Sequence, residues 1–327
     1  GLLESSGYMS RAAFLMDSVM ARAGLSGKAF LPLFSSYACA IPGIMATRTI
    51  DSAKERLVTI FVAPWMSCSA RLPVYFLIVP LLLGEKEGSW KQALILFGIY
   101  ALGTVTAFVV ARILRGRLGP EATASHFMLE LPSYRRPQWP YIFRHVLDRA
   151  WAFVRKAGTI ILGLSILLWA LQTYPKSNSE DPGEVLAHSA MGRIGKLIEP
   201  VVKPLGFDGR TGTAILTSFA AREVFVSSIG IIFSVEEAAD DVETRSLIRR
   251  KIAKATWPDG RRLFTPLSMV SLLVFFIYAL QCLPTTAVVA REAGSWKWAI
   301  GQFVFMSGFA YLASFLVFQG GRLLGFV

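Results

Sequence analysis

The sequence predicts an all-α protein that crosses a membrane several times. Of its 327 residues, 54% are hydrophobic and only 17% are charged, whereas roughly 25% of the residues of soluble domains are charged. The mean hydropathy is +0.49. The apolar residues gather in blocks that approach the roughly 20 residues a helix needs to cross hydrocarbon. Two repeated units of broken helices, described below, complete the predicted architecture of this polytopic helical protein.

About seven spans are expected within the chain. An eighth is expected before Gly1, because residues 1–7 resemble the end of a helix whose start is missing. The predicted spans lie near 29–47, 57–83, 92–112, 151–174, 211–234, 266–290 and 296–320.

Basic residues follow the membrane pattern and explain the net charge of +12 without nucleic acid as a partner. They gather in two loops, 112–156 and 245–262. The positive-inside rule places both loops in the cytoplasm. Counting crossings then puts 1–28 and 175–209 outside and the C-terminus in the cytoplasm, with the bilayer as the main partner.

Short motifs recur in the same order in two parts of the chain. The motif pairs are Ser36-Tyr-Ala-Cys39 with Ser218-Phe-Ala-Ala221, Phe61 to Cys68 with Phe275 to Cys282, and Gly88-Ser-Trp-Lys91 with Gly294-Ser-Trp-Lys297. The spacing from Phe to Cys is the same in both copies of the second motif. The two copies have the same orientation if all broken segments span, and are inverted if one is re-entrant.

These matches predict two repeats joined by a linker. The first repeat covers 1–115, the cytoplasmic linker 116–147 and the second repeat 148–327, with a cytoplasmic insert near 235–265. Residues 8–27 are expected to form an amphipathic helix on the outer surface. Residues 236–255 are expected to form a surface helix that is acidic at its start and basic at its end, as the helix dipole favours.

Proline and glycine are predicted to break the membrane helices and to allow gating. Proline removes an amide donor and clashes with the preceding turn, and glycine loosens the backbone. The residues expected at these breaks are Pro42, Gly43, Pro64, Pro73 and Pro284. Broken helices are tolerated in lipid where they line a cavity, so the carbonyl groups of Ala38 and Cys39 are expected to be free to coordinate an ion.

Sulfur-containing residues at these breaks predict a path for a soft or borderline metal ion. The candidate metal ligands are Cys39, Met66, Cys68, Glu223 and Cys282. Ser67, Ser69, Gln281 and Thr285 are weaker oxygen donors along a secondary path. Thiolate and thioether groups select soft ions, and a carboxylate broadens the choice toward Fe(II), Mn(II) or Zn(II). No histidine lies in a predicted span, which counts against the usual zinc site.

Two charged residues in mid-span require protein or water around them. These are Arg71 and Glu223, since a charge at the bilayer centre costs roughly 2.5–3.5 kcal/mol. Glu223 is a functional candidate on that ground. The alternative is a structural ion pair of Glu223 with Arg71 or with its neighbour Arg222.

Other functions remain open. A nucleoside or small-solute transporter would need more polar groups at the breaks than Glu223 and Gln281 supply. A thiol oxidoreductase would need a close cysteine pair, which the sequence lacks. An NTPase is not expected, because the nearest approach to a phosphate-binding loop is Leu25-Ser-Gly27-Lys28-Ala29, with Ala29 where Ser or Thr must bind Mg²⁺.

Five longer motifs are distributed over the whole chain. They are Glu4-Ser-Ser-Gly-Tyr-Met-Ser-Arg-Ala-Ala-Phe14, Ala40-Ile-Pro-Gly-Ile-Met-Ala-Thr-Arg-Thr49, Ala63-Pro-Trp-Met-Ser-Cys-Ser-Ala-Arg-Leu-Pro-Val74, Ala221-Arg-Glu-Val224 and Arg291-Glu-Ala-Gly-Ser-Trp-Lys-Trp298. Together they resemble the membrane domain of the bacterial ferrous iron transporters of the FeoB family. The two repeats resemble the two Gate regions of that family, whose cysteines fall on Cys39, Cys68 and Cys282.

The resemblance implies a function and partners. It implies Fe²⁺ as the substrate, taken up across the bacterial inner membrane by the permease part of a GTP-dependent transporter. GTP and Mg²⁺ would bind only to an N-terminal G domain that is absent from this chain. A small FeoA-type SH3-like protein is a further expected partner, and homo-oligomerisation stays open.

Overall fold

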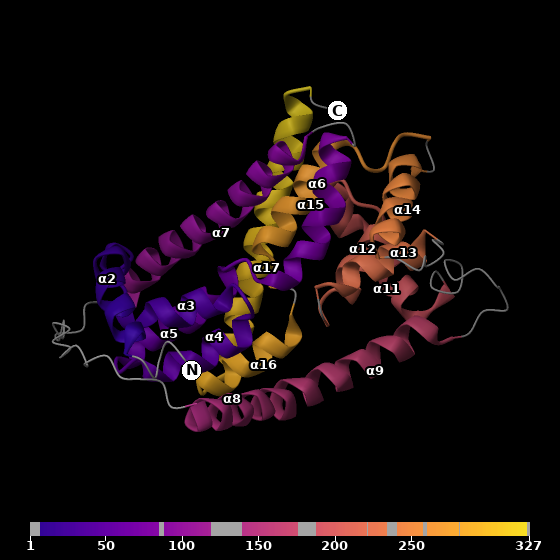
Figure 1. Ribbon diagram of the computed structural model, residues 1–327. Helices are drawn as coiled ribbons and strands as arrows, with labels where there is room; N and C mark the ends of the chain where they lie inside the picture. The colour runs from indigo at the N-terminus through magenta and orange to yellow at the C-terminus, as the bar shows by residue number, and fades with distance from the viewer. Residues whose placement is uncertain are drawn as a thin grey trace. The chain divides into compact units, whose positions relative to one another are not determined.

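The computed structural model describes residues 7–84, 88–118, 139–175, 188–220, 222–233, 241–257, 260–280 and 282–325. Within these ranges helices are the only regular elements, apart from one isolated bridge between Thr256 and Arg262. The predicted all-α class is therefore confirmed (Figure 1). Gln281, one of the predicted oxygen donors, lies outside the described residues, as do 119–138 of the linker and Glu236, Glu237 and Asp240 of the insert.

The α-helices are α2 (Tyr8–Arg22), α3 (Phe30–Ser36), α4 (Ala40–Ala46), α5 (Ala53–Val62), α6 (Leu72–Leu83), α7 (Ser89–Leu118), α8 (Trp139–Phe153), α9 (Thr159–Thr173), α11 (Ala190–Val202), α12 (Gly209–Thr217), α13 (Val224–Ile232), α14 (Asp241–Lys254), α15 (Pro266–Tyr278), α16 (Leu283–Glu292) and α17 (Trp296–Leu323). Short 3₁₀ turns are η1 (Gly27–Ala29), η2 (Thr47–Thr49), η3 (Ala63–Trp65), η4 (Ser69–Arg71) and η6 (Lys203–Leu205), and a π-helical turn, η5 (Val154–Gly158), joins α8 to α9.

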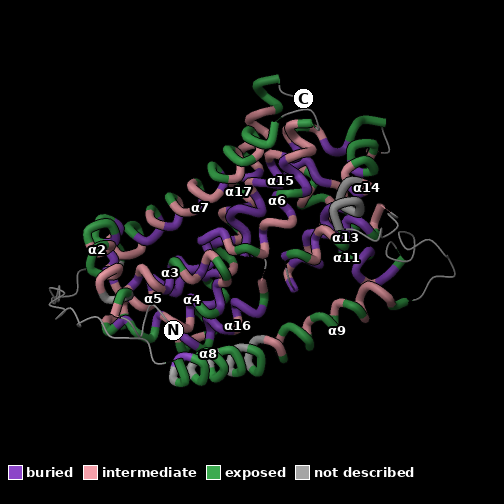
Figure 2. The backbone as a smooth tube through the Cα atoms, viewed as in Figure 1, coloured by how far each residue is buried: buried purple, intermediate pink, exposed green. Residues whose placement is uncertain are grey.

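Four helical stretches are long and apolar enough to cross a membrane within the described part of the chain. They are Ala53–Leu83, Ser89–Arg117, Pro266–Glu292 and Trp296–Leu323, and Thr159–Thr173 is a shorter apolar helix. In the most apolar window of Pro266–Glu292, 76% of residues are buried, against 17% for Ser89–Arg117. Exposed residues recur along α7 (Figure 2). They include Leu94, Phe97 and Val105, as expected for a helix facing lipid.

The segment 29–47 does not form the predicted span. It is divided into α3 and α4, each of 7 residues and too short to cross. Lys28, before the segment, forms an ion pair with Asp51 after it. The amide of Ser26 also donates to the Glu55 carboxylate, at 2.6 Å. The two ends of the segment thus lie together, so the chain enters and returns.

The predicted separation of 1–28 from the loop that begins at Arg112 is also wrong. Arg112 Nη1 donates to the carbonyl of Arg22 at 2.7 Å. A Cβ placed on Gly24 would lie 3.0 Å from Cγ of Arg115. The end of α2 therefore packs against the end of α7. The crossing count, with a span at 29–47, did not predict this contact.

The segment 211–234 is likewise divided rather than continuous. Helices α12 and α13 have 9 residues each and are separated by turns at 218–220 and 222–223. Thr217 Oγ1 donates to Ser228 Oγ at 2.8 Å across this break. A Cβ on Gly195 would lie 1.9 Å from Thr213 Oγ1, so α11 and α12 are also in close contact.

Two expected surface helices are present, over 8–22 and 241–254. The described chain packs as two compact units, and each combines segments from both predicted repeats. The first unit comprises 1–69, 100–160 and 284–302, and the second comprises 70–99, 161–283 and 303–327. Trp65 is a fully buried residue of the first unit, and the rings of Phe225 and Phe276 meet at 4.6 Å in the second.

Candidate functional site at the paired helix breaks

Three of the four prolines predicted at helix breaks lie shortly after a break, in the first turn of a helix. Pro42 is the third residue of α4, and Pro73 and Pro284 are the second residues of α6 and α16. The first turn of a helix has no internal partner for its amides, so proline is tolerated there. Pro64 differs, because it lies in η3, which continues directly from α5, and the extended backbone begins after it, at Met66.

Gly43 has a different role from the one predicted. It lies inside α4, where a Cβ would be 2.0 Å from Oγ of Ser36 and 2.7 Å from the carbonyl oxygen of Pro32. Both of these groups belong to α3. Gly43 thus allows α3 and α4 to pack closely, and the backbone break is at Tyr37–Cys39.

In the first unit, two broken segments are joined directly. The amide of Ser69 donates to the carbonyl of Tyr37, and its hydroxyl donates to the carbonyl of Ala38, both at 2.9 Å. Cys68 precedes the donor and Cys39 follows the acceptors. The structure therefore brings together the backbone of two cysteine-bearing breaks that are far apart in the sequence.

The expectation that the carbonyls of Ala38 and Cys39 are free is wrong. The Ala38 carbonyl accepts the Ser69 hydroxyl, and the Cys39 carbonyl accepts the Gly43 amide at 3.4 Å. Opening a helix does expose carbonyl groups. Here the facing break and the first turn of α4 satisfy them.

The second unit contains the same contact. The amide of Leu283 donates to the carbonyl of Phe219 at 2.9 Å. Leu283 follows Cys282 just as Ser69 follows Cys68, and Phe219 occupies the place of Tyr37 in the repeated tetrapeptide. In both units the first amide of a new helical segment thus meets the carboxyl end of a short helix. The two copies of the sequence motif thus share this backbone contact.

The serine and the aromatic residue of the tetrapeptide have matching roles as well. Ser36 Oγ donates to the carbonyl of Pro32 at 2.8 Å, and Ser218 Oγ donates to the carbonyl of Ile215 at 2.6 Å. Both serines are fully buried. These hydroxyl groups satisfy a carbonyl in the last turn of each short helix.

Each aromatic ring of the tetrapeptide packs on the long helix that follows the repeated Gly-Ser-Trp-Lys. The ring of Tyr37 stacks on Tyr100 of α7 at 6.3 Å, and its hydroxyl contacts Thr104 at 2.6 Å. The ring of Phe219 packs on Phe303 of α17 at 5.7 Å. A long apolar helix thus fixes the tip of each break.

The predicted sulfur and hydroxyl ligands differ in access. Cys39, Cys68 and Cys282 form no disulfide, and part of the surface of each is exposed. Met66 and Ser67, in contrast, are buried, as is Thr285. The described residues contain no group of three or more His, Cys, Asp or Glu positioned to hold a metal ion. A site at these breaks would therefore have to use thiols together with serine or backbone oxygens.

Arg71 and Arg222 are both buried in the second unit and point to one helix end. Arg71 Nη1 donates to the carbonyl of Ile277 at 2.6 Å, and Arg222 Nη2 donates to that of Ala279 at 3.3 Å. The break after α15 removes the amides that would otherwise pair with these carbonyls. Cations are also favourable at the carboxyl end of a helix. This contact accounts for an arginine at position 71 in an apolar segment.

Glu223 is the residue immediately before α13, and its side chain is exposed. None of the described residues forms an ion pair with it, so the alternative of a structural pair with an arginine gains no support. It remains a candidate ligand on the face of the 218–223 break.

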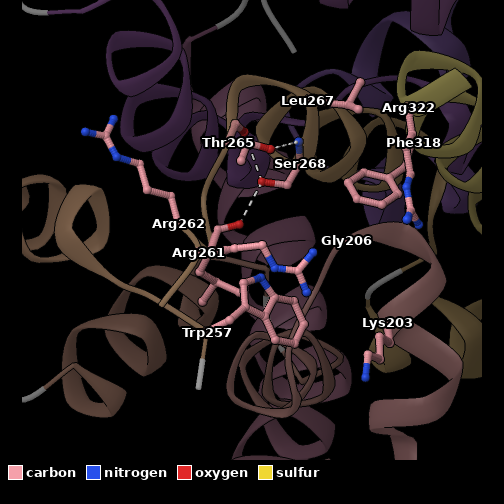
Figure 3. A pocket seen from close by; sticks show the side chains of 11 residues that line it. Lys203, Gly206, Trp257, Arg261, Arg262, Thr265, Leu267, Ser268, Phe318 and Arg322 are labelled. Carbon is pink, nitrogen blue, oxygen red and sulfur yellow. Dashed lines mark hydrogen bonds between the residues drawn. The ribbon is translucent and has the colours of Figure 1, made fainter. Parts of the chain in front are cut away.

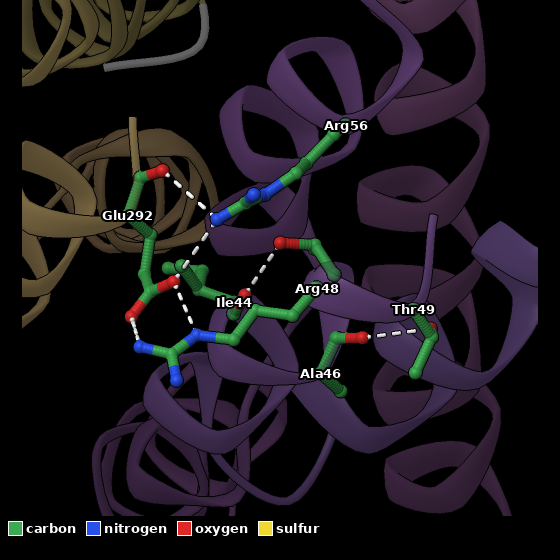
Figure 4. A network of polar contacts seen from close by, with 7 residues as sticks. Ile44, Ala46, Arg48, Thr49, Arg56 and Glu292 are labelled. Atoms are coloured by element: carbon green, nitrogen blue, oxygen red, sulfur yellow. Dashed lines mark hydrogen bonds and ion pairs between the residues drawn. The ribbon is translucent and has the colours of Figure 1, made fainter. Parts of the chain in front are cut away.

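A network around the buried carboxylate of Glu292 in the first unit was not predicted from the sequence (Figure 4). Arg48 binds both oxygens of Glu292, with Nε to Oε2 at 2.8 Å. Arg56 Nη2 lies 3.2 Å from Oε2 and 3.2 Å from the carbonyl of Glu292. The side chain of Glu292 is only 3% exposed. The hydrogen bond from Glu292 raises the pKa of Arg48, with the carboxylate charge adding to it.

Glu292 is 244 residues from Arg48 in the chain, so no local pattern links them. The pair joins the end of α16 to η2 and α5. Both residues lie in motifs that carry the family resemblance, which is the one signal that could have drawn attention to them.

A family model described as Gate, nucleoside recognition, matches residues 1–82 and 154–296. The chain belongs to this family. A second model, described as Ferrous iron transport protein B C terminus, matches residues 96–149 of this Gate protein. The two models together cover the paired breaks and the helix α7 that packs on the first of them.

Curated relatives of this Gate protein are named Fe(2+) transporter FeoB. The protein from Leptospira biflexa is 43% identical over 332 residues, which cover 100% of this chain and 48% of the relative. The protein from Helicobacter pylori is 34% identical, over 99% of this chain and 53% of the relative. The chain thus spans about half the length of these relatives. No solved structure matches it.

Proposed function

We propose that this chain is the permease part of a ferrous iron uptake system of the bacterial inner membrane. The observation that carries the proposal is the repeated contact at the two breaks, where a cysteine precedes the amide that bridges to the facing segment. This contact places a partly exposed thiol at a helix end in each unit. The names of the relatives supply the ion.

The proposed ligands are the three thiols, with Met66 and Glu223 as further candidates. Thiolate and thioether sulfur suit a borderline ion such as Fe²⁺, and an exposed carboxylate suits its approach. Ser67, Ser69 and Thr285 would add hydroxyl oxygens along the path. Mn²⁺ and Zn²⁺ have similar preferences and are the competing ions.

Gating is proposed to occur at the breaks. Half-helices that meet end to end can separate without losing their internal hydrogen bonds, because the bonds between them are few. In the first unit Ser69 supplies these bonds, and in the second Leu283 does. Pro42, Pro64, Pro73 and Pro284 keep the segments from merging into continuous helices.

GTP dependence and the partners are proposed from the half of each relative that this chain does not cover. A gate that alternates must be biased by something with different affinity for its states. We assign this role to a G domain that binds GTP and Mg²⁺ outside this chain. One relative, from Porphyromonas gingivalis, is named Fe(2+) transport protein A/Fe(2+) transporter FeoB fusion protein and is 36% identical. A FeoA-type protein is therefore a proposed partner.

The chain itself is proposed to lack nucleotide hydrolysis. In the segment nearest to a phosphate-binding loop, the Gly27 amide donates to Asp17 Oδ1 at 2.6 Å and Lys28 pairs with Asp51. These are the groups that such a loop would offer to phosphate. They are engaged with carboxylates instead.

In the proposed topology the four long stretches and α9 cross the membrane. The pair α3–α4 enters and leaves on the outer side, and the pair α12–α13 enters and leaves on the cytoplasmic side. This makes the two repeats inverted. It keeps the C-terminus and the basic loop 245–262 in the cytoplasm, as the positive-inside rule favours. It places the other basic loop, 112–156, outside, because α9 then crosses from the outside to the cytoplasm. A fusion of alkaline phosphatase to the C-terminus should be inactive, and an active fusion would reverse this orientation.

The function is tested by ⁵⁵Fe²⁺ uptake in cells that lack other ferrous importers, with this chain joined to the remaining half of a relative. Cys68→Ser and Cys282→Ser should each reduce uptake, and the double variant should abolish most of it. As a control, the amount of each variant inserted in the membrane is measured by blotting. Normal uptake by a normally inserted double variant would overturn the metal path.

A nucleoside transporter is the second candidate, because the matching family model is described as nucleoside recognition. Uptake of labelled uridine by the same cells separates the two. Uridine uptake that Fe²⁺ does not affect would favour this alternative.

A further inference from the structure

A cavity of about 370 Å³ lies in the second unit, away from the helix breaks (Figure 3). It lies where α15 begins and α17 ends, and η6 and the turn that follows α14 complete its wall. These ends belong to two of the stretches that are long enough to cross a membrane. The cavity is therefore expected at the level where the bilayer meets water.

Cationic side chains from three different elements line this cavity. Lys203 comes from η6, Arg261 from the turn after α14, and Arg322 from the last turn of α17. In Figure 3 the guanidinium group of Arg261 reaches in beside the Trp257 ring, whereas the side chain of the neighbouring Arg262 points away. No Asp or Glu is among the described residues that form the lining. The described lining is therefore net positive.

The cavity also has an apolar wall, formed by Trp257, Leu267 and Phe318. A Cβ at Gly206 would lie 2.3 Å from the Phe318 ring, and Gly206 has a φ of +89°. Only glycine allows this ring to lie so close to η6. The cavity thus combines cations with aromatic surface, as an amphipathic ligand requires.

The turn that carries Arg261 is held by backbone hydrogen bonds. The Trp257 amide donates to the Arg261 carbonyl at 2.8 Å, and the Leu263 amide donates to the Ala255 carbonyl at 2.9 Å. The Ser268 amide donates to Thr265 Oγ1 at 3.3 Å, so Thr265 caps the start of α15. The cationic groups are therefore presented on fixed elements, which lowers the entropy cost of binding.

We propose that this cavity binds the phosphate group of an anionic ligand. Phosphate neutralises several cations at once, and the planar guanidinium forks of Arg261 and Arg322 match its oxygens. The amino end of α15, which is 13 residues long, adds a favourable dipole. The same chemistry could come from an anionic phospholipid headgroup or from free phosphate. Basic pockets between membrane helices suit the first source.

The test measures binding by calorimetry to the full chain in a neutral detergent, with three probes at fixed ionic strength. The probes are dioctanoyl-phosphatidylglycerol, dioctanoyl-phosphatidylcholine and inorganic phosphate. The phosphatidylglycerol probe should bind saturably and at least about tenfold more tightly than phosphatidylcholine. Arg261→Gln and Arg322→Gln should each weaken it roughly fivefold, the factor expected for one cation near an anionic headgroup.

Arg262→Gln is the matched control and should change the affinity less than about twofold, because its side chain points away. Arg261→Lys keeps the charge but loses the planar fork, so it should weaken binding less than Arg261→Gln does. Inorganic phosphate that binds as tightly, with the same variant pattern, would assign the cavity to free phosphate. Equal binding of both lipids, absence of binding by all probes, or an equal loss in Arg262→Gln would overturn the proposal.

Discussion

Replacing Gly43 with alanine should destabilise the first unit. The added Cβ would lie 2.0 Å from Ser36 Oγ, 2.7 Å from the carbonyl oxygen of Pro32 and 3.1 Å from Ser36 Cβ. Ser36 cannot move away freely, since its hydroxyl bonds to Pro32 and the residue is fully buried. The carbonyl is part of α3. The two helices must therefore separate to admit one methyl group.

The size of the effect follows from two opposing terms. Overpacking a buried contact costs typically about 1–3 kcal/mol. Replacing glycine by alanine within a helix returns roughly 0.5–1 kcal/mol. The net loss should be about 1–2 kcal/mol. The separation would also move Tyr37 and Ala38 at the tip, whose carbonyls accept the two hydrogen bonds from Ser69.

Thermal unfolding of the purified chain in detergent measures the loss, and Gly98→Ala is the matched control. Gly98 lies in α7, and nothing lies within 4 Å of its added Cβ. The Gly43→Ala variant should unfold a few degrees lower, whereas Gly98→Ala should be unchanged or slightly more stable. Unchanged unfolding of Gly43→Ala would refute the close packing of α3 on α4.

Three further changes test other parts of the site. Glu292→Gln should lower stability by about 1–3 kcal/mol in the same assay, because two arginines lose a buried carboxylate. The control Arg291→Gln, at the exposed neighbouring residue, should change stability little. Equal effects of the two changes would contradict the role of Glu292. Arg71→Gln should cost about 1–3 kcal/mol by uncovering the Ile277 carbonyl, and a wild-type melting curve would contradict the capping role. Glu223→Gln should reduce ⁵⁵Fe²⁺ uptake more than Glu223→Asp, and equal uptake would remove Glu223 from the path.

The sequence was sufficient to predict the class of the protein and the places where its helices break. Long apolar blocks predict helices because lipid offers no partners for backbone groups. The blocks over 57–83, 92–112, 266–290 and 296–320 correspond to stretches long enough to cross a membrane. The repeated cysteine motif located both break contacts, because its residues and spacing are local properties of the chain.

Only the tertiary structure decided whether each broken segment continues or folds back, and which groups it contacts. Hydropathy could not separate a span at 29–47 from a segment that returns, because both bury the same apolar residues. The contacts of Lys28 with Asp51 and of Arg112 with Arg22 show the return. The partner of Glu292 was equally hidden, since an ion pair across 244 residues depends on packing and leaves no local pattern. Composition and spacing thus determine the helices and their breaks, whereas the satisfaction of each buried polar group depends on which segments meet in space.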